Sequence, residues 1–89
     1  MKDKRPMEKT IHSRDYATLL RLLKKSREDA GITQVELAER LGQTQSFVSK
    51  IERGESRLDI LQLRTILKHL GMSLSSFVTQ LETELAKRR

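Results

Sequence analysis

The sequence predicts an all-α protein of five helices, because two patterns recur along the chain and a third is missing. Apolar residues return at spacings of three and four, the period of a helix that buries one side. These runs follow serine, threonine or aspartate, which cap helix N-termini, and most of them stop at glycine. No segment alternates apolar and polar residues over a useful length, so no strand is expected.

The first helix is expected to begin at Ser13 or Asp15, either of which can cap it, and to end at Ala30 before Gly31. Its inward stripe alternates spacings of four and three. The stripe consists of Tyr16, Leu20, Leu23, Arg27 and Ala30, with Leu19 beside it.

Arg27 occupies a place in this stripe where the pattern requires a hydrophobic residue. The side chain must either extend to water along its aliphatic stem or meet an acid that also faces inward. Glu52 is such an acid, because it follows Ile51 directly and lies four residues beyond Val48 on a later helix. We therefore expect a partly buried salt bridge between Arg27 and Glu52.

The stretch TQVELAERLGQTQSFVSKIERG, residues 33–54, reads as two short helices joined by a turn. Thr33 and Glu36 have the spacing of a capping box, in which each side chain binds the other residue's free backbone N–H. Leu37, Ala38 and Leu41 would form the apolar face of the first of the two. Gly42 stands where the chain leaves this helix with positive φ.

The second helix of this stretch spans residues 44–53, with Thr44 as its cap and Val48 and Ile51 on its buried side. The residues on its other side are short, uncharged or basic, and rich in hydrogen-bond donors. That side presents Gln45, Ser46, Ser49 and Lys50. Two helices joined by a short glycine turn, the second with such a face, are typical of a DNA-binding helix-turn-helix.

Two more helices complete the prediction. Asp59 has the position of an N-cap, with Gln62 three residues later, and Gly71 ends this fourth helix. Its buried residues are expected to be Leu63, Ile66, Leu67 and Leu70. Ser73 caps a fifth helix, residues 73–86, and basic residues follow it, as suits a helix C-terminus.

The apolar stripe of the fifth helix runs longer than its neighbours need. Leu74, Phe77 and Val78 can reach the core, whereas Leu81 and Leu85 lie one and two turns further out. Because small monomers rarely expose large apolar patches, we expect a dimer surface that includes Phe77, Leu81 and Leu85. The alternative is that the outer leucines only cover the back of the first helix.

The chain is expected to form one helix-turn-helix domain, residues 13–86, between a flexible basic arm (1–12) and a basic tail (87–89). The net charge of +6 lies in the two ends. Residues 1–14 and 87–89 each carry an excess of three positive charges, and residues 15–86 have ten charges of each sign. Overall basicity therefore gives no support to phosphate binding by the folded body.

Composition excludes several classes of function. The chain has no cysteine, so no disulfide, thiolate metal site or thiol nucleophile is possible, and its two histidines are not spaced as metal ligands. No cofactor and no metal are expected, and no nucleophile–base pair or glycine-rich phosphate loop suggests an enzyme. Without an apolar run long enough to span a bilayer or a signal peptide, the protein is expected to be cytoplasmic, with no membrane partner.

The run GITQVELAERLGQTQSFVSKIERGESRLDI, followed by LRTILKHLGMSLSSF, resembles the helix-turn-helix of phage lambda repressor and Cro, the XRE-type regulators. That family includes restriction-modification controllers and antitoxin-type regulators. The resemblance covers about Tyr16 to Leu81, and it implies a compact lambda-repressor-like domain of bacterial or phage origin. Bound to DNA, such a protein would be nucleoid-associated.

The resemblance also implies roles at matching positions. Those that face bases are Thr44, Gln45, Ser46, Ser49 and Lys50. Those that meet the DNA backbone are Gln34, Phe47, Arg53 and Arg57, where Phe47 is expected to be exposed because Val48 and Ile51 define the inward side. Arg27 and Glu52 match a salt bridge found in some members, in agreement with the pattern argument.

The expected function is sequence-specific transcriptional regulation, in most such proteins repression, by a homodimer on double-stranded DNA. One recognition helix reads too few base pairs to select a site in a genome, whereas two, about 34 Å apart, read a palindrome. The alternative is an antitoxin that binds a toxin partner and regulates its own operon. The basic ends and the length of the fifth helix are compatible with this alternative.

Overall fold

The computed structural model describes residues 13–87, which form five α-helices joined by short turns. Their bounds are α1 Arg14–Asp29, α2 Gln34–Leu41, α3 Gln45–Glu52, α4 Ile60–His69 and α5 Leu74–Ala86. No strand occurs within this range. The all-α prediction and the number of helices are confirmed, whereas the arm at 1–12 and the last two residues of the tail lie outside the described residues.

Each helix starts where a short polar side chain accepts a hydrogen bond from the free N–H groups of its first turn. The capping residues are Ser13, Thr33, Thr44, Asp59 and Ser73. The expected capping box of Thr33 and Glu36 is present, and a second one joins Asp59 to Gln62. Local sequence alone therefore fixes where the helices begin.

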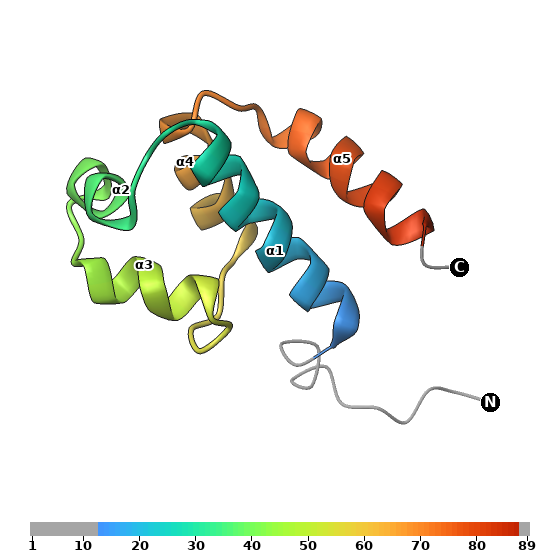
Figure 1. Ribbon diagram of the computed structural model, residues 1–89, viewed down its shortest axis with the longest axis horizontal. Helices are drawn as coiled ribbons and strands as arrows, with labels where there is room; N and C mark the ends of the chain where they lie inside the picture. Colours follow the sequence, from blue (N-terminus) through green and yellow to red (C-terminus); the bar gives the residue numbers. More distant parts are fainter. Residues whose placement is uncertain (1–12, 88–89) are drawn as a thin grey trace.

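Helix α1 is the central element of the arrangement (Figure 1). It contacts α3 on one side and α5 on the other, where α5 runs in the opposite direction, while α4 contacts both α2 and α5. The core between them is aliphatic, with one phenylalanine. It consists of Leu23, Ile32, Leu37, Ala38, Val48, Ile51, Leu63, Ile66, Leu67 and Phe77. Through this core α3 packs against α1 and α2, while α2 also contacts α4, and α3 lies on the side of the molecule away from α5.

Two small polar residues of α1 are buried although the sequence pattern gave no sign of it. Thr18 is 2% exposed and Ser26 is 7% exposed. The hydroxyl groups of both donate to the backbone carbonyl four residues earlier, Thr18 to Arg14 at 3.1 Å and Ser26 to Leu22 at 2.9 Å. Such bonds satisfy the proton of a buried hydroxyl inside its own helix.

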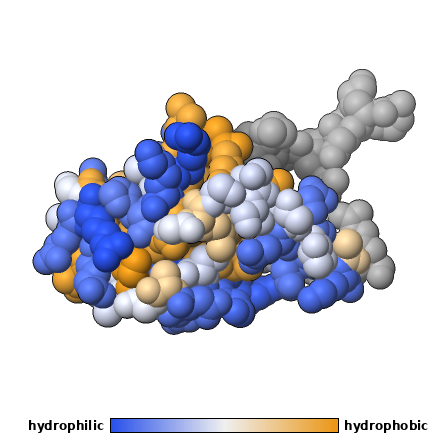
Figure 2. Space-filling model, turned by 90° about the horizontal axis from the view of Figure 1, so that it is seen from above, coloured by the Kyte–Doolittle hydropathy of each residue, from blue (hydrophilic) through white to orange (hydrophobic). Residues whose placement is uncertain are grey.

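The surface is mixed, and no helix within residues 13–87 is long and apolar enough to span a bilayer. In the space-filling view, hydrophilic residues surround smaller hydrophobic patches (Figure 2). The large hydrophobic side chains that are exposed are Val35, Ile60, Leu61 and Val78. The expectation that Val78 reaches the core is wrong, since Val78 is 39% exposed.

Candidate nucleic-acid interface

The turn between α2 and α3 sets the direction in which α3 leaves the core. Gly42 adopts φ 68°, a conformation that glycine reaches without steric strain. This left-handed residue lets the next amide, that of Gln43, donate back to the carbonyl of Ala38 at 2.8 Å. The left-handed conformation of Gly42 and this hydrogen bond together end α2 and bring Thr44 to the start of α3.

Helix α3 buries one side and exposes the other. Val48 and Ile51 are 3% and 2% exposed and anchor the helix in the core. On the opposite side Gln45, Ser46 and Lys50 are exposed. The structure thus places these three of the predicted base-contacting residues together on one outward face of a helix.

The other two predicted base-contacting residues are already engaged within the protein. The Thr44 hydroxyl accepts the amide of Phe47 at 3.2 Å as the N-cap of α3. Ser49 is half-buried, and its hydroxyl accepts a hydrogen bond from the Arg53 guanidinium. Each hydroxyl keeps its own proton, so both can still donate to an outside acceptor.

The salt bridge expected between Arg27 and Glu52 is present. Arg27 Nε lies 2.6 Å from Glu52 Oε2 and Nη2 lies 3.1 Å from Oε1, with side chains only 8% and 5% exposed. Arg27 Nη1 also donates to the carbonyl of Ile32 at 2.9 Å. The Glu52 hydrogen bond raises the pKa of Arg27 above its ordinary value, although burial acts in the opposite direction. The pair joins α1 to the last turn of α3.

A chain of hydrogen bonds continues from this buried pair to the surface. Gln34, at the start of α2, donates through Nε2 to Glu52 Oε1 at 2.9 Å. Gln45, at the start of α3, donates through Nε2 to Gln34 Oε1 at 3.1 Å. Because Gln34 uses both ends of its amide, it fixes the orientation of the exposed Gln45 amide, whose carbonyl oxygen and second N–H remain available. The bridging role of Gln34 was not predicted.

A basic edge, which we define as Lys50, Arg53 and Arg57, follows from the end of α3 into the next loop, and all three residues are exposed. Arg53 is paired with the carboxylate of Glu55, with Nε 2.8 Å from Oε2. Arg53 was predicted to meet the DNA backbone, and its pairing with Glu55 was not predicted. The only signal available was an arginine and a glutamate on either side of Gly54.

Phe47 departs from expectation. It is half-buried and packs against the core, so the prediction of an exposed phenylalanine is wrong. With Leu41 and Leu61 it lines a shallow groove of about 310 Å³ between α2, α3 and α4. The inward side of α3 therefore includes Phe47 as well as Val48 and Ile51, and residues of α4 form another wall of the groove.

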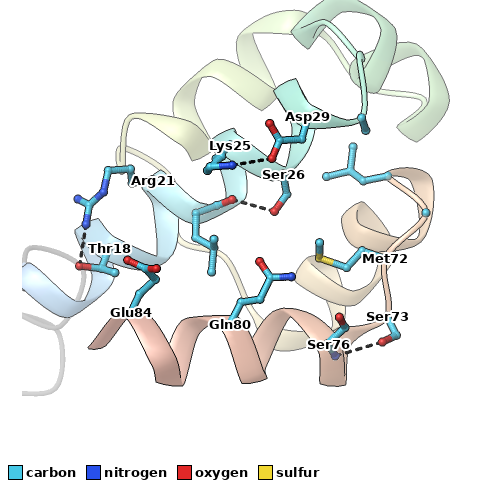
Figure 3. A pocket seen from close by; sticks show the side chains of 14 residues that line it. Thr18, Arg21, Lys25, Ser26, Asp29, Met72, Ser73, Ser76, Gln80 and Glu84 are labelled. Carbon is cyan, nitrogen blue, oxygen red and sulfur yellow. Dashed lines mark hydrogen bonds and ion pairs between the residues drawn. The ribbon is translucent and has the colours of Figure 1, made fainter. Parts of the chain in front are cut away.

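The dimer surface expected on α5 also needs correction. Phe77 is 0% exposed and belongs to the core, so its side chain cannot line an outside surface. Leu81 and Leu85 are half-buried, on a helix that contacts α1. Between α1 and α5 lies an open groove of about 900 Å³ with mostly polar walls, into which Gln80 points from α5 (Figure 3).

The fold and this outward face define the class of protein. Helices α2 and α3 form a helix-turn-helix whose second helix is anchored by its buried side and presents amide, hydroxyl and ammonium groups outward. Residues 23–77 match the helix-turn-helix family model. The chain belongs to the XRE-type helix-turn-helix family, and it is a DNA-binding transcriptional regulator and not an enzyme.

Two solved structures are similar over most of the chain. An XRE-family-like protein from Pseudomonas syringae pv. tomato str. DC3000 is 45% identical, with a TM-score of 0.77, and the match covers 86% of this chain and 94% of that one. A mutant of the restriction-modification controller protein C.Esp1396I is 32% identical, with a TM-score of 0.76, over 86% and 98% of the two chains. No curated protein sequence matches significantly.

Proposed function

We propose that the chain is a homodimeric repressor that acts in the bacterial cytoplasm, with helix α3 in the major groove of a palindromic operator. The observation that carries the proposal is the Gln45 amide, held outward by Gln34 at the start of α3. A glutamine fixed in this way presents its free carbonyl and N–H as a pair, which is the pattern that recognises adenine N6 and N7.

The neighbours of Gln45 extend the proposed contact. Lys50, one and a half turns further along α3, has the chemistry to donate to guanine N7 and O6. Thr44, Ser46 and Ser49 are proposed to complete the base contacts, with hydroxyl groups that donate or accept. The proposed backbone contacts are Gln34, Phe47, Arg53 and Arg57.

A dimer is supported by the small number of base pairs that one recognition helix can read. A single α3 reads only a few base pairs, which cannot distinguish one site in a genome. Two copies related by a two-fold axis would read an inverted repeat with half-sites about 34 Å apart. The half-buried leucines of α5, Leu81 and Leu85, lie on the helix furthest from α3 and are proposed as the surface between the copies. The similarity to a restriction-modification controller supports a regulator of this kind.

Selection of bound sequences from random duplex DNA tests the proposal. We expect an inverted repeat whose half-sites are about one helical turn apart, and an affinity that falls steeply with salt because phosphates are neutralised. The matched control is Gln45→Ala with Lys50→Ala, which removes two exposed side chains and should select no common sequence. Enrichment of a single half-site would contradict the dimer. Failure of the wild-type protein to enrich any sequence would contradict the proposed function and favour the antitoxin alternative.

A further inference from the structure

The Arg53 guanidinium is occupied on the face where the proposed function needs it. Its Nε donates to Glu55 Oε2 at 2.8 Å and its Nη2 donates to Glu55 Oε1 at 3.1 Å. The third nitrogen, Nη1, donates to the hydroxyl of Ser49, one turn earlier on α3. This two-point contact of a guanidinium fork with a carboxylate has the geometry by which arginine also binds a phosphate.

The end of α3 holds Glu55 in place to make this contact. The helix closes with Gly54 at φ 77°, and the amide of Gly54 donates to the carbonyl of Ile51 at 3.0 Å. The next two amides, of Glu55 and Ser56, both donate to the carbonyl of Lys50, at 2.8 and 3.2 Å. The backbone of Glu55 is therefore tied to the last turn of α3, and its carboxylate faces back toward Arg53.

The pair is nevertheless open to exchange. Both side chains are 54% exposed, so water and ions reach them from outside. Exposed ion pairs are weak, because solvent screens them and two long side chains must be held in one geometry. This differs from the Arg27–Glu52 pair, whose side chains are 8% and 5% exposed. A phosphate approaching α3 can therefore replace the carboxylate, at the cost of breaking the Arg53–Glu55 contact.

We propose that Glu55 is an intramolecular competitor that occupies the phosphate-binding fork of Arg53 and so limits the sequence-independent affinity of the protein for DNA. The inference rests on the proposed function and assigns a role to a residue outside the predicted contact set. Glu55 lowers the local charge of the basic edge from three positive groups to a net of two. Contacts to bases by Gln45 are unaffected, so the carboxylate lowers the affinity for operator and for unrelated DNA alike and leaves the preferred sequence unchanged.

The test measures binding to operator and to unrelated duplex DNA over a range of salt concentrations, for wild type, Glu55→Gln, Arg53→Gln and the double variant. Glu55→Gln keeps the shape of the side chain and removes the charge. We expect it to tighten binding to unrelated DNA by about two- to fivefold, the range that exposed ion pairs are worth. The slope of log K against log salt should steepen by at most about 0.9, the value for one phosphate that Glu55 keeps away from Arg53 in the wild-type complex. In the Arg53→Gln background, Glu55→Gln should have no such effect.

Three outcomes would overturn the inference. Glu55→Gln could leave wild-type affinity and salt slope unchanged, or it could weaken operator binding, which would mean that the carboxylate positions Arg53 for DNA. It could also tighten binding equally in the Arg53→Gln background, which would mean direct repulsion of the phosphates. Glu39→Gln, which removes an exposed acid on α2, controls for the change in net charge. If none of the proteins binds any DNA, the proposed function fails and this inference fails with it; if wild type binds and Glu55→Gln behaves like it, only the inference fails.

Discussion

Arg27 of α1 and Glu52 of α3 form a two-point ion pair, with Nε 2.6 Å from Oε2 and Nη2 3.1 Å from Oε1, at a place that solvent hardly reaches. The same carboxylate oxygen that accepts from Nη2, Oε1, also accepts from Gln34 at 2.9 Å. Glu52 therefore takes part in packing and, through Gln34, in the orientation of Gln45. One residue links the stability of the domain to the geometry of the surface proposed to read DNA.

Replacement of Glu52 by alanine should strongly destabilise the protein. Arg27 would keep its charge without a carboxylate partner in a buried place, and the expected loss is about 3–5 kcal/mol of unfolding free energy. Urea denaturation followed by circular dichroism measures it. Asp29→Ala is the control, since it breaks an exposed pair with Lys25 and should leave the midpoint close to that of wild type.

A second comparison separates loss of a pair from loss of one partner. The double variant Arg27→Met with Glu52→Leu removes both charges and fills similar volume, so it should recover much of the lost stability. A Glu52→Ala protein that unfolds at the wild-type urea concentration would contradict the structural role given to the pair. A double variant no more stable than Glu52→Ala would mean that packing at this place, and not the charge, is decisive.

Gln45→Ala should relax sequence preference at one base pair in each half-site. Loss of a two-point contact to a base costs about 1–3 kcal/mol of discrimination, while affinity for unrelated DNA stays nearly constant. The measurement is binding to the selected operator and to operators substituted at single positions. Arg57→Ala is the comparison, because loss of a phosphate contact should weaken all duplexes alike and lower the salt slope by about 0.9. Equal weakening on every sequence by Gln45→Ala would contradict its assignment as a base contact.

The capping box of α2 should contribute stability that is lost in acid. The backbone N–H of Thr33 donates to the Glu36 carboxylate at 2.9 Å and holds the pKa of Glu36 below its ordinary value of 4.5. A lowered folded pKa means that the contribution is complete above pH 4.5 and declines as the pH falls below it. Glu36→Gln keeps an acceptor without the charge, so its difference in urea midpoint from wild type should shrink between pH 6 and about pH 3.

The second capping box supplies the reciprocal control. In this box, formed by Asp59 and Gln62, the residue that corresponds to Glu36 is Gln62, which is neutral. Gln62→Glu should therefore introduce the dependence of stability on pH that Glu36→Gln removes. A difference between Glu36→Gln and wild type that stays constant over the whole range would show that the charge of Glu36 makes no contribution.

Much of this fold could be predicted from the sequence because its signals are local. Caps, capping boxes and turn glycines act within four residues, and the structure has the five N-caps at expected positions. The Arg27–Glu52 pair could also be inferred, since each charge stands in an otherwise apolar stripe. A charged residue at an apolar position of the stripe therefore predicted a specific contact, which the apolar residues around it did not.

Other features depend on packing between helices, which a periodic pattern does not determine. Phe77 and Val78 are adjacent on α5, and only the position of α5 against α1 and α4 decides that one is 0% and the other 39% exposed. Phe47 is half-buried because it packs against the core, beside a groove that it shares with Leu61 of α4. The Arg53–Glu55 contact arises from the backbone bend at Gly54, and its two residues are both of kinds that are normally solvated.

The role of α5 in self-association can be tested with Leu81→Glu combined with Leu85→Glu. Both leucines are half-buried, so two carboxylates there should disfavour a surface between copies while the core, including Phe77, remains filled. We expect a lower mass by sedimentation equilibrium, weaker operator binding, and a circular dichroism spectrum that still shows the helices. Leu61→Glu is the matched control, because Leu61 is 71% exposed on α4 and its replacement should leave the mass unchanged. A double variant with the mass and operator affinity of wild type would show that the copies associate through another surface.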